Sequence, residues 1–543
     1  MKTIYEMLRA RAGDERTGLV TGEARWSWAE VVRASEARAN LASKLLGDGP
    51  PHICILLDND PEFCLWLGAA ALGGKVVVGG NPTHRGTELA RDISHTECQM
   101  LVTDARHFEL VEGLHLGDSI GRARADNDRI LILGSSEYDR ALSTASGPHS
   151  SDSLAPDVAP STLGYLIFTS GTSGAPKAVR CSQGRMAFIG SVITEMFSLG
   201  PSDVCYVAMP LFHSNALMAG WAPALAAGAT VALPSGGRFS ASGFLPDVRR
   251  HGVTYFNYVG KPLSYILATP QRPDDADTTL RQVFGNEAAV GDIARFAQRF
   301  GCLVSDGYGS TEGGAAMSRT QETPYGSLGV GINVIIVDPE TKAECPPAKF
   351  DDDGKLVNAG EAIGEIVSTS GAAGFEGYWN NEEAERARVH DGWYWTGDLG
   401  YIDEAGFVYF AGRTDDWLRV DGENFAAAPV ARILERHPDV VLAAVYAAPD
   451  EIIGDQVMAA LQLRDDATFD PIGFAAFLSH QQDLGTKWVP RYVRICRLLP
   501  TTATSKILTR MLRAEGLECL DPVWVRGEAG FLPFYRSKPS HVL

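Results

Sequence analysis

Short apolar runs alternate with stretches of helical pattern through much of the first four hundred residues. Strand candidates lie at 53–57, 100–103, 130–133, 165–169, 230–233 and 253–257. Helix candidates such as 61–72, 182–197 and 292–300 lie between these runs or follow them. This alternation predicts an α/β fold with largely parallel sheets. Strands this apolar are usually covered on both faces.

The pattern changes near Asp415. Residues 393–412 are aromatic and glycine-rich, as short strands and turns are, and residues 425–543 read as a small α+β unit. A chain of 543 residues is also too long for one hydrophobic core. We therefore predict an N-terminal domain at 1–414 and a C-terminal domain at 415–543. Residues 147–161, rich in Ser, Pro, Ala and Asp, are expected to form an exposed connection.

One stretch, 204–236, carries no Lys, Arg, Asp or Glu and could be mistaken for a membrane span. Pro210, Pro223 and Gly228 interrupt it, and it is rich in alanine, so a core strand, helix and strand fit it better. No apolar signal segment precedes the charged sequence near the N-terminus. We predict a cytoplasmic protein without an integral membrane segment, and leave open a peripheral membrane association and a homodimer.

Charge and cysteine content exclude some classes of partner. The net charge of −19 disfavours nucleic acid, so any positive charge that binds an anionic substrate must be local. The nine cysteines form neither a CxxC pair nor a tight cluster with histidine. Buried reduced thiols are therefore a better interpretation than a disulfide framework or a zinc site.

The clearest chemical signal is the loop from Thr169 to Lys177, which follows an apolar strand and precedes a helical pattern. Its open backbone amides, its hydroxyls and the Lys177 ammonium can hold phosphate oxygens. A Walker A loop would place the lysine directly after the second glycine. Here Lys177 stands three residues after Gly174, so a P-loop NTPase is disfavoured.

Four later segments, 306–313, 394–398, 412–416 and 500–506, complete an ordered series with this loop. The series resembles the phosphate loop, Y-G-x-T-E, T-G-D, hinge and catalytic-lysine motifs of the adenylate-forming superfamily. That superfamily includes acyl-CoA synthetases, luciferases and peptide-synthetase adenylation domains. The F-G-N at 284–286, the R-x-x-G-E-N at 419–424 and the ending 521–533 are similar to the fatty-acid-transport-protein branch, the very-long-chain acyl-CoA synthetases.

This resemblance implies a large N-terminal domain of parallel-rich sheets packed with helices, with a small barrel-like subdomain. It also implies a smaller, mobile α+β C-terminal domain that swings about a hinge at Asp415. The co-substrates and cofactor that it implies are ATP, CoA and Mg²⁺.

The resemblance assigns an ATP- or AMP-binding role to fourteen positions. Tyr308 is expected to stack on adenine, Asp306 to accept from its amino group, and Asp398 to accept from both ribose hydroxyls. The full set is Thr169, Ser170, Gly171, Thr172, Ser173, Gly174, Lys177, Gly285, Asn286, Asp306, Gly307, Tyr308, Asp398 and Arg413.

Three positions are expected to act directly in adenylation. Glu312 is the expected Mg²⁺ ligand, since Mg²⁺ prefers oxygen, and Thr311 is expected to contact the α-phosphate. Lys506 is expected to bridge the carboxylate and the α-phosphate, because attack of one anion on another builds negative charge.

Acyl and CoA surfaces are assigned in the same way. His213, Tyr258, Val259, Gly260 and Gly309 are expected to line the acyl pocket, with a satisfied core histidine as the alternative for His213. Arg419, Gly422, Glu423 and Asn424 are expected to face the CoA entrance.

The predicted function is an acid–thiol ligase that activates a long-chain or bulky hydrophobic acid, a fatty acid or a steroid side-chain acid, through an acyl-adenylate. Two alternatives stay open. One is an acyl-adenylating enzyme that loads a separate carrier protein, and the other is a lipid uptake or binding protein.

Overall fold

The computed structural model describes residues 2–146, 157–169, 176–288, 290–319, 322–324, 326–339, 341–351, 356–372, 374–413, 417–420, 423–450, 454–481, 484–485, 487–502, 507–527 and 530–534. The chain forms two compact units. The N-terminal unit comprises Met1–Gly314 and Ala372–Val389, and the C-terminal unit comprises Ala315–Gly371 and His390–Leu543. The predicted boundary residue Asp415 lies outside the described residues, so that boundary stays a prediction.

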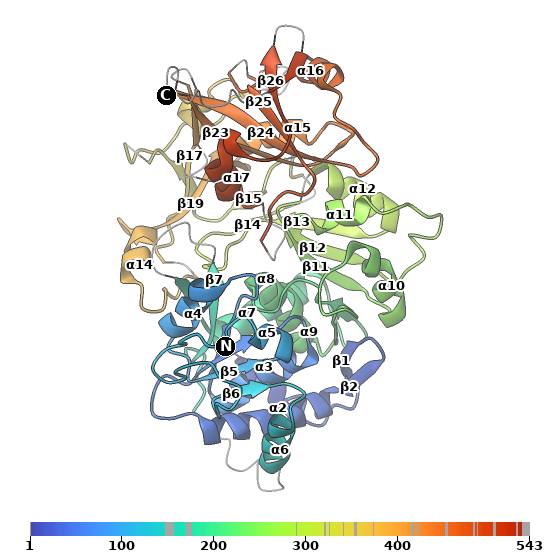
Figure 1. Cartoon of the computed structure of the whole chain (residues 1–543), viewed down its shortest axis with the longest axis vertical. Helices are drawn as coiled ribbons and strands as arrows, with labels where there is room; N and C mark the ends of the chain where they lie inside the picture. The colour runs from blue at the N-terminus through green and yellow to red at the C-terminus, as the bar shows by residue number, and fades with distance from the viewer. Residues whose placement is uncertain are drawn as a thin grey trace, which may run out of the picture. The chain divides into compact units, whose positions relative to one another are not determined.

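Two largely parallel sheets form the N-terminal unit (Figure 1). The first sheet is parallel except at its β1–β2 edge, and the second is parallel except at its β7–β8 edge. In spatial order the first contains β13 (Leu303–Gly307), β12 (Gln282–Asn286), β11 (Tyr255–Val259), β9 (Val204–Tyr206), β10 (Thr230–Ala232), β1 (Thr17–Thr21) and β2 (Ala24–Ser27). The second contains β6 (Ile130–Ile132), β5 (Met100–Thr103), β3 (His52–Leu56), β4 (Val76–Gly79), β7 (Leu163–Thr169) and β8 (Lys177–Ser182).

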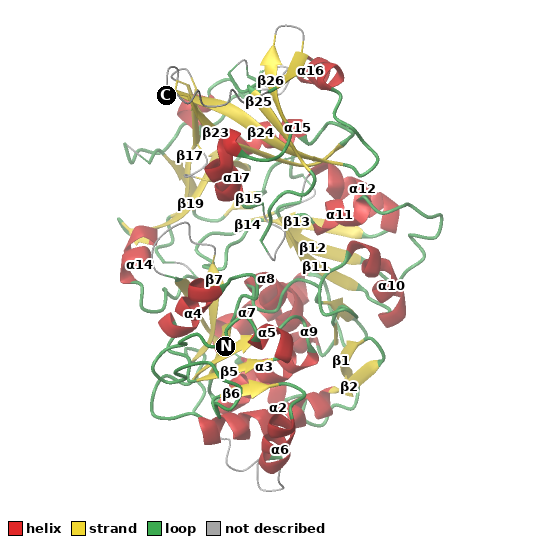
Figure 2. Cartoon of the chain, in the orientation of Figure 1, coloured by secondary structure: helices red, strands yellow, loops and turns green. Residues whose placement is uncertain are grey.

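Helices of the N-terminal unit alternate with these strands (Figure 2). Asp60 caps α3, because its carboxylate accepts from the Glu62 amide at 2.8 Å while Pro61 occupies the first turn. The helices are α1 (Ile4–Arg9), α2 (Trp28–Leu45), α3 (Pro61–Gly73), α4 (Gly86–His95), α5 (Ala105–Phe108), α6 (Ser136–Ala145), α7 (Gln183–Met196), α8 (Ser214–Ala216), the π-helix Leu217–Trp221, α9 (Ala222–Ala227), α10 (Ala241–His251), α11 (Pro262–Leu267), α12 (Val290–Phe300) and α14 (Glu382–Arg388).

The second sheet is buried on both faces, as its apolar strands predict. All five residues of β3 are buried. Cys54 and Leu56 of β3 pack in one core cluster with Leu89 and Ile93 of α4. Apolar burial of this kind contributes roughly 25 cal/mol per Å² removed from water.

The C-terminal unit begins with an antiparallel, curled half-barrel sheet. Its main strands are β16 (Val334–Val337), β17 (Gly364–Ser368), β19 (Trp393–Ile402) and β20 (Val408–Arg413), and β14 (Met317–Ser318), β15 (Val330–Gly331) and α13 (Ala359–Ala362) precede or connect them. The sequence predicted short strands over 393–412, whereas β19 alone spans ten residues. Its length follows from pairing along both edges, with β17 and with β20.

A mixed sheet with helices forms the rest of this unit and confirms the α+β prediction. Val457, Ala459 and Leu461 alternate along β24 and face one core, with Val430 of α15 and Phe474 of α16. The elements are β21 (Trp417–Val420), β22 (Glu423–Ala426), α15 (Ala427–Leu434), β23 (Val440–Asp450), β24 (Gly454–Leu463), α16 (Pro471–Ser479), β25 (Tyr492–Cys496), α17 (Thr509–Glu515), a 3₁₀ turn Gly516–Glu518, β26 (Val523–Gly527) and β27 (Gly530–Pro533).

The uncharged stretch 204–236 folds into β9, a short helical run and β10, as predicted. Among the residues that the structure describes, no helix is long and apolar enough to cross a membrane. Eight of the nine cysteines are buried, Cys345 is partly buried, and each is a free thiol. The strand predicted at 253–257 lies two residues later, because β11 takes its register from β12 and continues to Val259.

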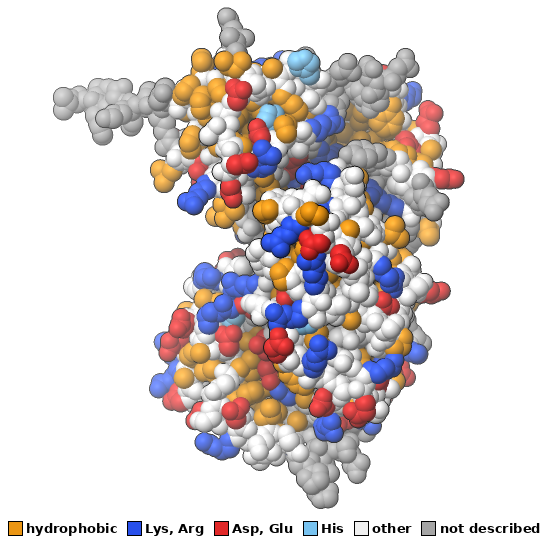
Figure 3. Space-filling view, turned by 90° about the vertical axis from the view of Figure 1, so that its right-hand side faces the viewer, with side chains coloured by type: hydrophobic (Ala, Val, Ile, Leu, Met, Phe, Trp, Pro, Cys, Tyr) orange, Lys and Arg blue, Asp and Glu red, His pale blue; other side chains and the backbone are white. Residues whose placement is uncertain are grey.

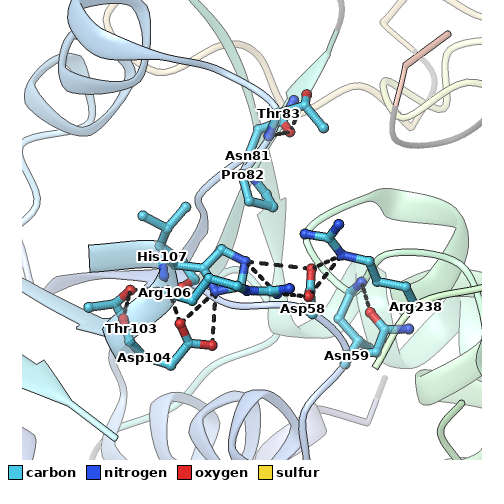
Figure 4. A network of polar contacts seen from close by, with 12 residues as sticks. Asp58, Asn59, Asn81, Pro82, Thr83, Thr103, Asp104, Arg106, His107 and Arg238 are labelled. Carbon is cyan, nitrogen blue, oxygen red and sulfur yellow. Dashed lines mark hydrogen bonds and ion pairs between the residues drawn. The ribbon is translucent and has the colours of Figure 1, made fainter. Parts of the chain in front are cut away.

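A network of charged side chains joins the two sheets of the N-terminal unit (Figure 4). Asp58 follows β3 and accepts hydrogen bonds from Arg106 and from Arg238, the latter at 2.9 Å. His107 lies between Asp58 and Asp104, with its Nδ1 2.9 Å from the Asp104 carboxylate. Burial alone would raise the pKa of Asp58, but hydrogen bonds from His107, Arg238 and Arg106 outweigh it and lower the pKa.

Asn59 fixes the segment that leads from β9 to His213. Its side-chain amide donates to the carbonyl oxygens of Val207 and Met209 at 2.9 and 2.8 Å. Its oxygen accepts from the Leu211 amide at 2.9 Å. Both the nitrogen and the oxygen of this buried side chain are hydrogen-bonded, so Asn59 sets the path of the segment across the sheet ends.

The α7–α9 contact requires a glycine at position 190. A Cβ there would lie 2.8 Å from the carbonyl carbon and oxygen of Ala222, which are backbone atoms that cannot turn away. We predict that Gly190→Ala lowers the free energy of unfolding by about 1–3 kcal/mol. Urea unfolding measures this change. Gly13→Ala is the control, because a Cβ at Gly13 meets nothing within 4 Å. Equal stability of the two variants would contradict the packing described for α7.

Candidate functional site

The predicted site residues of 258–260, 285–286 and 306–309 lie at the carboxyl ends of three parallel strands. The strand register pairs Val259 with Asn286 and Asn286 with Gly307, so β11, β12 and β13 end level with one another. The Asn286 side chain donates to the Gly307 carbonyl at 2.7 Å, and the Gly260 amide donates to the Asn286 carbonyl at 2.9 Å. Ligands of open α/β sheets bind at this edge.

Asp306 is held in place from the neighbouring strand and loop. The Tyr258 hydroxyl donates to its carboxylate at 2.6 Å, and the Ala288 amide donates to the same oxygen at 3.1 Å. Gly285 of β12 lies between Tyr258 and Asp306, and a Cβ at this position would lie 2.3 Å from the Tyr258 carbonyl oxygen. Only glycine fits at this position. Tyr258 is fully buried, and its expected acyl-pocket role stays a prediction.

Tyr308 and Gly309 directly follow β13, and the loop then reaches Thr311 and Glu312. The Ser214 and Thr311 hydroxyls lie 2.7 Å apart. The Asn215 side chain donates to the Tyr258 carbonyl at 2.9 Å. Residues 213–215 are therefore tied to two of the strand ends that carry the motifs.

His213 precedes these contacts and carries no charge at neutral pH. Burial of the imidazole, with a smaller effect of nearby His84, lowers its pKa to about 4. Its Nε2 is buried and has no hydrogen-bond partner among the described residues. This orphaned nitrogen argues against the alternative of a satisfied core histidine, and lining of the acyl pocket stays the prediction.

Glu312 is a buried carboxylate with one assigned donor. The Tyr378 hydroxyl lies 2.9 Å from its Oε1, and only 8% of Glu312 is exposed. A carboxylate oxygen is the kind of hard ligand that Mg²⁺ prefers. The buried Glu312 carboxylate therefore fits the expected metal, and its role as the Mg²⁺ ligand stays a prediction.

The phosphate loop connects two antiparallel strands of the second sheet. Thr169 ends β7 and Lys177 begins β8, and the two residues are paired in register. Ser170, Gly171, Thr172, Ser173 and Gly174 lie outside the described residues. The apolar strand expected before this motif is confirmed, but the helix expected directly after it is wrong, because β8 stands between Lys177 and α7. The contacts of the loop stay a prediction.

In the C-terminal unit, Asp398 stands within a distorted part of β19. The Thr396 hydroxyl donates to the Ile366 carbonyl at 2.7 Å and accepts from the Asp398 amide at 3.0 Å. Gly397 has φ +71°, a conformation that favours glycine. Asp398 and Arg413 are paired across β19 and β20, so the structure brings these two predicted residues together.

The predicted CoA-facing residues lie on a hairpin of the same unit. Arg419 of β21 is paired with Asn424 of β22, and Val420 is paired with Glu423. Asp415, Gly422 and Lys506 lie outside the described residues, so their roles stay predictions.

Basic and acidic side chains are interspersed on the face drawn in Figure 3 rather than gathered into one extended patch.

Comparison with known proteins decides the family. The AMP-binding enzyme family matches residues 8–379, and the AMP-binding enzyme C-terminal domain matches residues 430–506. The chain belongs to the AMP-binding enzyme family. Lys506 is the last residue of the second match.

Two relatives of this AMP-binding enzyme are similar over nearly its whole length. Steroid-22-oyl-CoA synthetase of Rhodococcus jostii (strain RHA1) is 51% identical over 529 residues, 96% of this chain and 93% of that protein. Medium/long-chain-fatty-acid–CoA ligase FadD17 of Mycobacterium marinum is 48% identical over 517 residues, 95% of this chain and 96% of that protein. The resemblance to acyl-CoA synthetases is confirmed.

More distant similarities agree with the fold and the branch. Human long-chain fatty acid transport protein 5 is 29% identical over 563 residues, 95% of this chain and 79% of that protein. The structure of o-succinylbenzoate CoA synthetase (MenE) from Bacillus subtilis, in complex with the acyl-adenylate intermediate OSB-AMP, superposes with a TM-score of 0.75 at 25% identity, covering 98% of this chain and 99% of that one.

Sequence reasoning missed several residues that shape this AMP-binding enzyme's site. Asn215 bonds the end of β11, Tyr378 bonds Glu312, and Arg185 donates to the Thr311 carbonyl at 2.7 Å. None of them belongs to a motif, and each partner is distant in sequence.

The low pKa of His213 makes the stability of the AMP-binding enzyme depend on pH. Its folded pKa of about 4 lies below the ordinary value of 6.5. The unfolded chain therefore binds a proton first, and stability is lost as pH falls from 6.5 towards 4. We predict that wild-type protein loses roughly 1–2 kcal/mol more than His213→Phe between pH 7 and pH 5.

Urea unfolding of both proteins at the two pH values measures this difference. Burial also lowers the pKa of His52 and His251, so only the difference between wild type and variant reports on His213. Parallel losses in the two proteins would contradict the assignment of a neutral His213 with a buried Nε2.

Proposed function

We propose that this protein activates a hydrophobic carboxylic acid, a steroid side-chain acid or a medium- to long-chain fatty acid, and transfers it to CoA. The protein is an AMP-forming acyl-CoA synthetase. One observation carries the proposal: two proteins named as CoA ligases for such acids are 51% and 48% identical to this chain over nearly its whole length.

The first half-reaction forms an acyl-adenylate. A carboxylate oxygen attacks the α-phosphorus of ATP, the bond to the β-phosphate breaks, and pyrophosphate leaves. The loop from Thr169 to Lys177 is proposed to hold the departing phosphates, and Thr311 to contact the α-phosphate. Lys506 is proposed to offset the repulsion between the two anions.

Glu312 would hold Mg²⁺, which neutralises phosphate charge when it is bound. Asp306 and Tyr308 are proposed to take the adenine at the carboxyl ends of β12 and β13. Asp306 already accepts from Tyr258 and Ala288. A carboxylate has lone pairs for a further donor, such as the adenine amino group.

The second half-reaction replaces AMP by the CoA thiol at the acyl carbonyl. We propose that the region after Asp415 moves between the half-reactions, as hinged domains do around ligands. Lys506 would then withdraw, and the β21–β22 hairpin with Arg419, Glu423 and Asn424 would face the CoA entrance. The relation of His213 to the acyl group is likewise a proposal.

An acid panel tests the activity and the substrate class together. Purified protein with ATP, Mg²⁺ and CoA is given fatty acids of increasing length and steroid side-chain acids, and AMP and acyl-CoA are quantified. We expect acyl-CoA and AMP in equal amounts from hydrophobic acids. Acyl-adenylate without thioester from every acid would contradict the CoA half and favour a separate carrier protein.

Lys506→Ala tests the assignment of the adenylating charge. Removing a group that stabilises transition-state charge lowers a rate by about 10²–10³-fold, so we expect acid-dependent ATP–pyrophosphate exchange to fall by this factor. Thioester formation from supplied acyl-adenylate should be retained, because that step does not use this charge. Lys44→Ala, at an exposed lysine near the end of α2, is the control.

Full exchange activity in Lys506→Ala would contradict this role. If the same substitution left the capture of acyl groups by cells unaltered, that result would instead favour lipid uptake without catalysis.

A further inference from the structure

A segment that returns to the N-terminal unit extends the edge of its second sheet. The Arg180 amide of β8 donates to the Gly377 carbonyl at 3.0 Å, and the Trp379 amide donates to the Ala178 carbonyl at 2.8 Å. These bonds pair the segment antiparallel to β8, the strand that begins at Lys177 of the phosphate loop. The strand β8 therefore connects directly to the phosphate loop and also pairs with this edge segment.

Side chains anchor the residues on both sides of Tyr378. The backbone amide and the hydroxyl of Ser182 each donate to the Glu376 carboxylate at 2.6 Å. Trp379 packs edge-on against the His52 ring at 4.6 Å, and its indole N–H donates to Glu97 at 3.2 Å. The backbone at Tyr378 is thus fixed by charge-assisted bonds before it and by a packed aromatic ring after it.

Tyr378 itself points at Glu312. Its side chain is 4% exposed, and its hydroxyl lies 2.9 Å from Glu312 Oε1. A carboxylate oxygen accepts, so the Tyr378 hydroxyl donates this hydrogen bond.

Arg185 holds the backbone of the loop that carries Thr311 and Glu312. Ser182 caps α7 by accepting the Arg185 amide at 3.1 Å, and the Arg185 guanidinium donates to the Thr311 carbonyl at 2.7 Å. A Cβ at Gly313 would lie 2.5 Å from that guanidinium, and Gly313 has φ +71°. The β8–α7 corner thus fixes both Thr311 and Glu312.

We propose that Tyr378 is a positioning residue for Glu312, and that it sets the carboxylate for the metal–ATP complex from the edge segment paired with β8, the strand that follows the phosphate loop. Because the phenol holds Oε1, the carboxylate is already ordered before the metal binds. Metal binding then loses less conformational entropy. The inference rests on the proposed role of Glu312 as the Mg²⁺ ligand. Loss of such a partner typically costs 10–100-fold in metal affinity.

The chain offers a matched control for this contact. Tyr138 is also 4% exposed, and its hydroxyl donates to the Glu62 carboxylate at 2.7 Å. Both phenols are thus buried, and each donates to a carboxylate oxygen. Tyr138→Phe and Tyr378→Phe therefore remove the same group from a similar environment, and only the second contact concerns the candidate site.

The experiment compares full-length wild type, Tyr378→Phe, Tyr138→Phe and Glu312→Gln. Binding of Mn²⁺ is followed by electron paramagnetic resonance with a non-hydrolysable ATP analogue, and the Mg²⁺ dependence of acid-dependent ATP–pyrophosphate exchange is measured separately. For Tyr378→Phe we expect Mn²⁺ affinity to fall by about tenfold or more. The Mg²⁺ concentration for half-maximal exchange should rise in parallel, and the rate at saturating Mg²⁺ should approach that of wild type. Tyr138→Phe should match wild type in both measurements.

Each other outcome overturns a distinct claim. Unchanged Mn²⁺ affinity and Mg²⁺ dependence in Tyr378→Phe, with Glu312→Gln impaired in both, would overturn the role of Tyr378 alone. Wild-type behaviour of Glu312→Gln would overturn the metal assignment on which it rests, and absence of acid-dependent exchange in wild type would overturn the proposed function. Failure of Tyr378→Phe to fold, while Tyr138→Phe folds, would make Tyr378 a structural residue and also overturn the inference.

Discussion

The hydrogen bond from the Tyr258 hydroxyl to the Asp306 carboxylate, 2.6 Å long, spans the middle strand of three and sets the candidate nucleotide site. It forms only because Gly285 carries no side chain, since a Cβ there would lie 2.3 Å from the Tyr258 carbonyl oxygen. The same Tyr258 carbonyl accepts from Asn215, so the segment after His213 is placed by the same residue. The close approach of β11 and β12 at Gly285 therefore helps to position both Asp306, which is expected to contact adenine, and the segment after His213, which is expected to line the acyl pocket.

Local sequence patterns were sufficient for the elements and motifs whose determinants are local. The strand Met100–Thr103 was predicted with its observed bounds, because a short apolar run ends at polar residues on both sides. Contacts between distant segments leave no such pattern. Arg185 and Thr311 are 126 positions apart, and Tyr378 and Glu312 are 66 apart. Neither pair could be found before the fold brought α7, the 310–313 loop and the β8 edge together.

The predicted site residues lie on sheets of two different kinds. Asp306 lies on β13, at the edge of the first sheet, and Thr311 and Glu312 follow that strand. Asp306 and Glu312 are buried, where packing leaves side chains little freedom. Asp398 stands on a curled antiparallel sheet, at a point where Gly397 takes a left-handed conformation. On the proposed function, rigid parts position ATP, and Lys506 belongs to the part that moves between half-reactions.

The most direct test of the account follows one oxygen atom. The acid is labelled with ¹⁸O in both carboxylate oxygens, converted with ATP and CoA, and the AMP is examined by mass spectrometry. Attack of the carboxylate on the α-phosphorus followed by thiol attack at the acyl carbon leaves one labelled oxygen on the phosphate of each AMP. That is the result predicted here. AMP without label, or label found in inorganic phosphate beside ADP, would contradict the acyl-adenylate route.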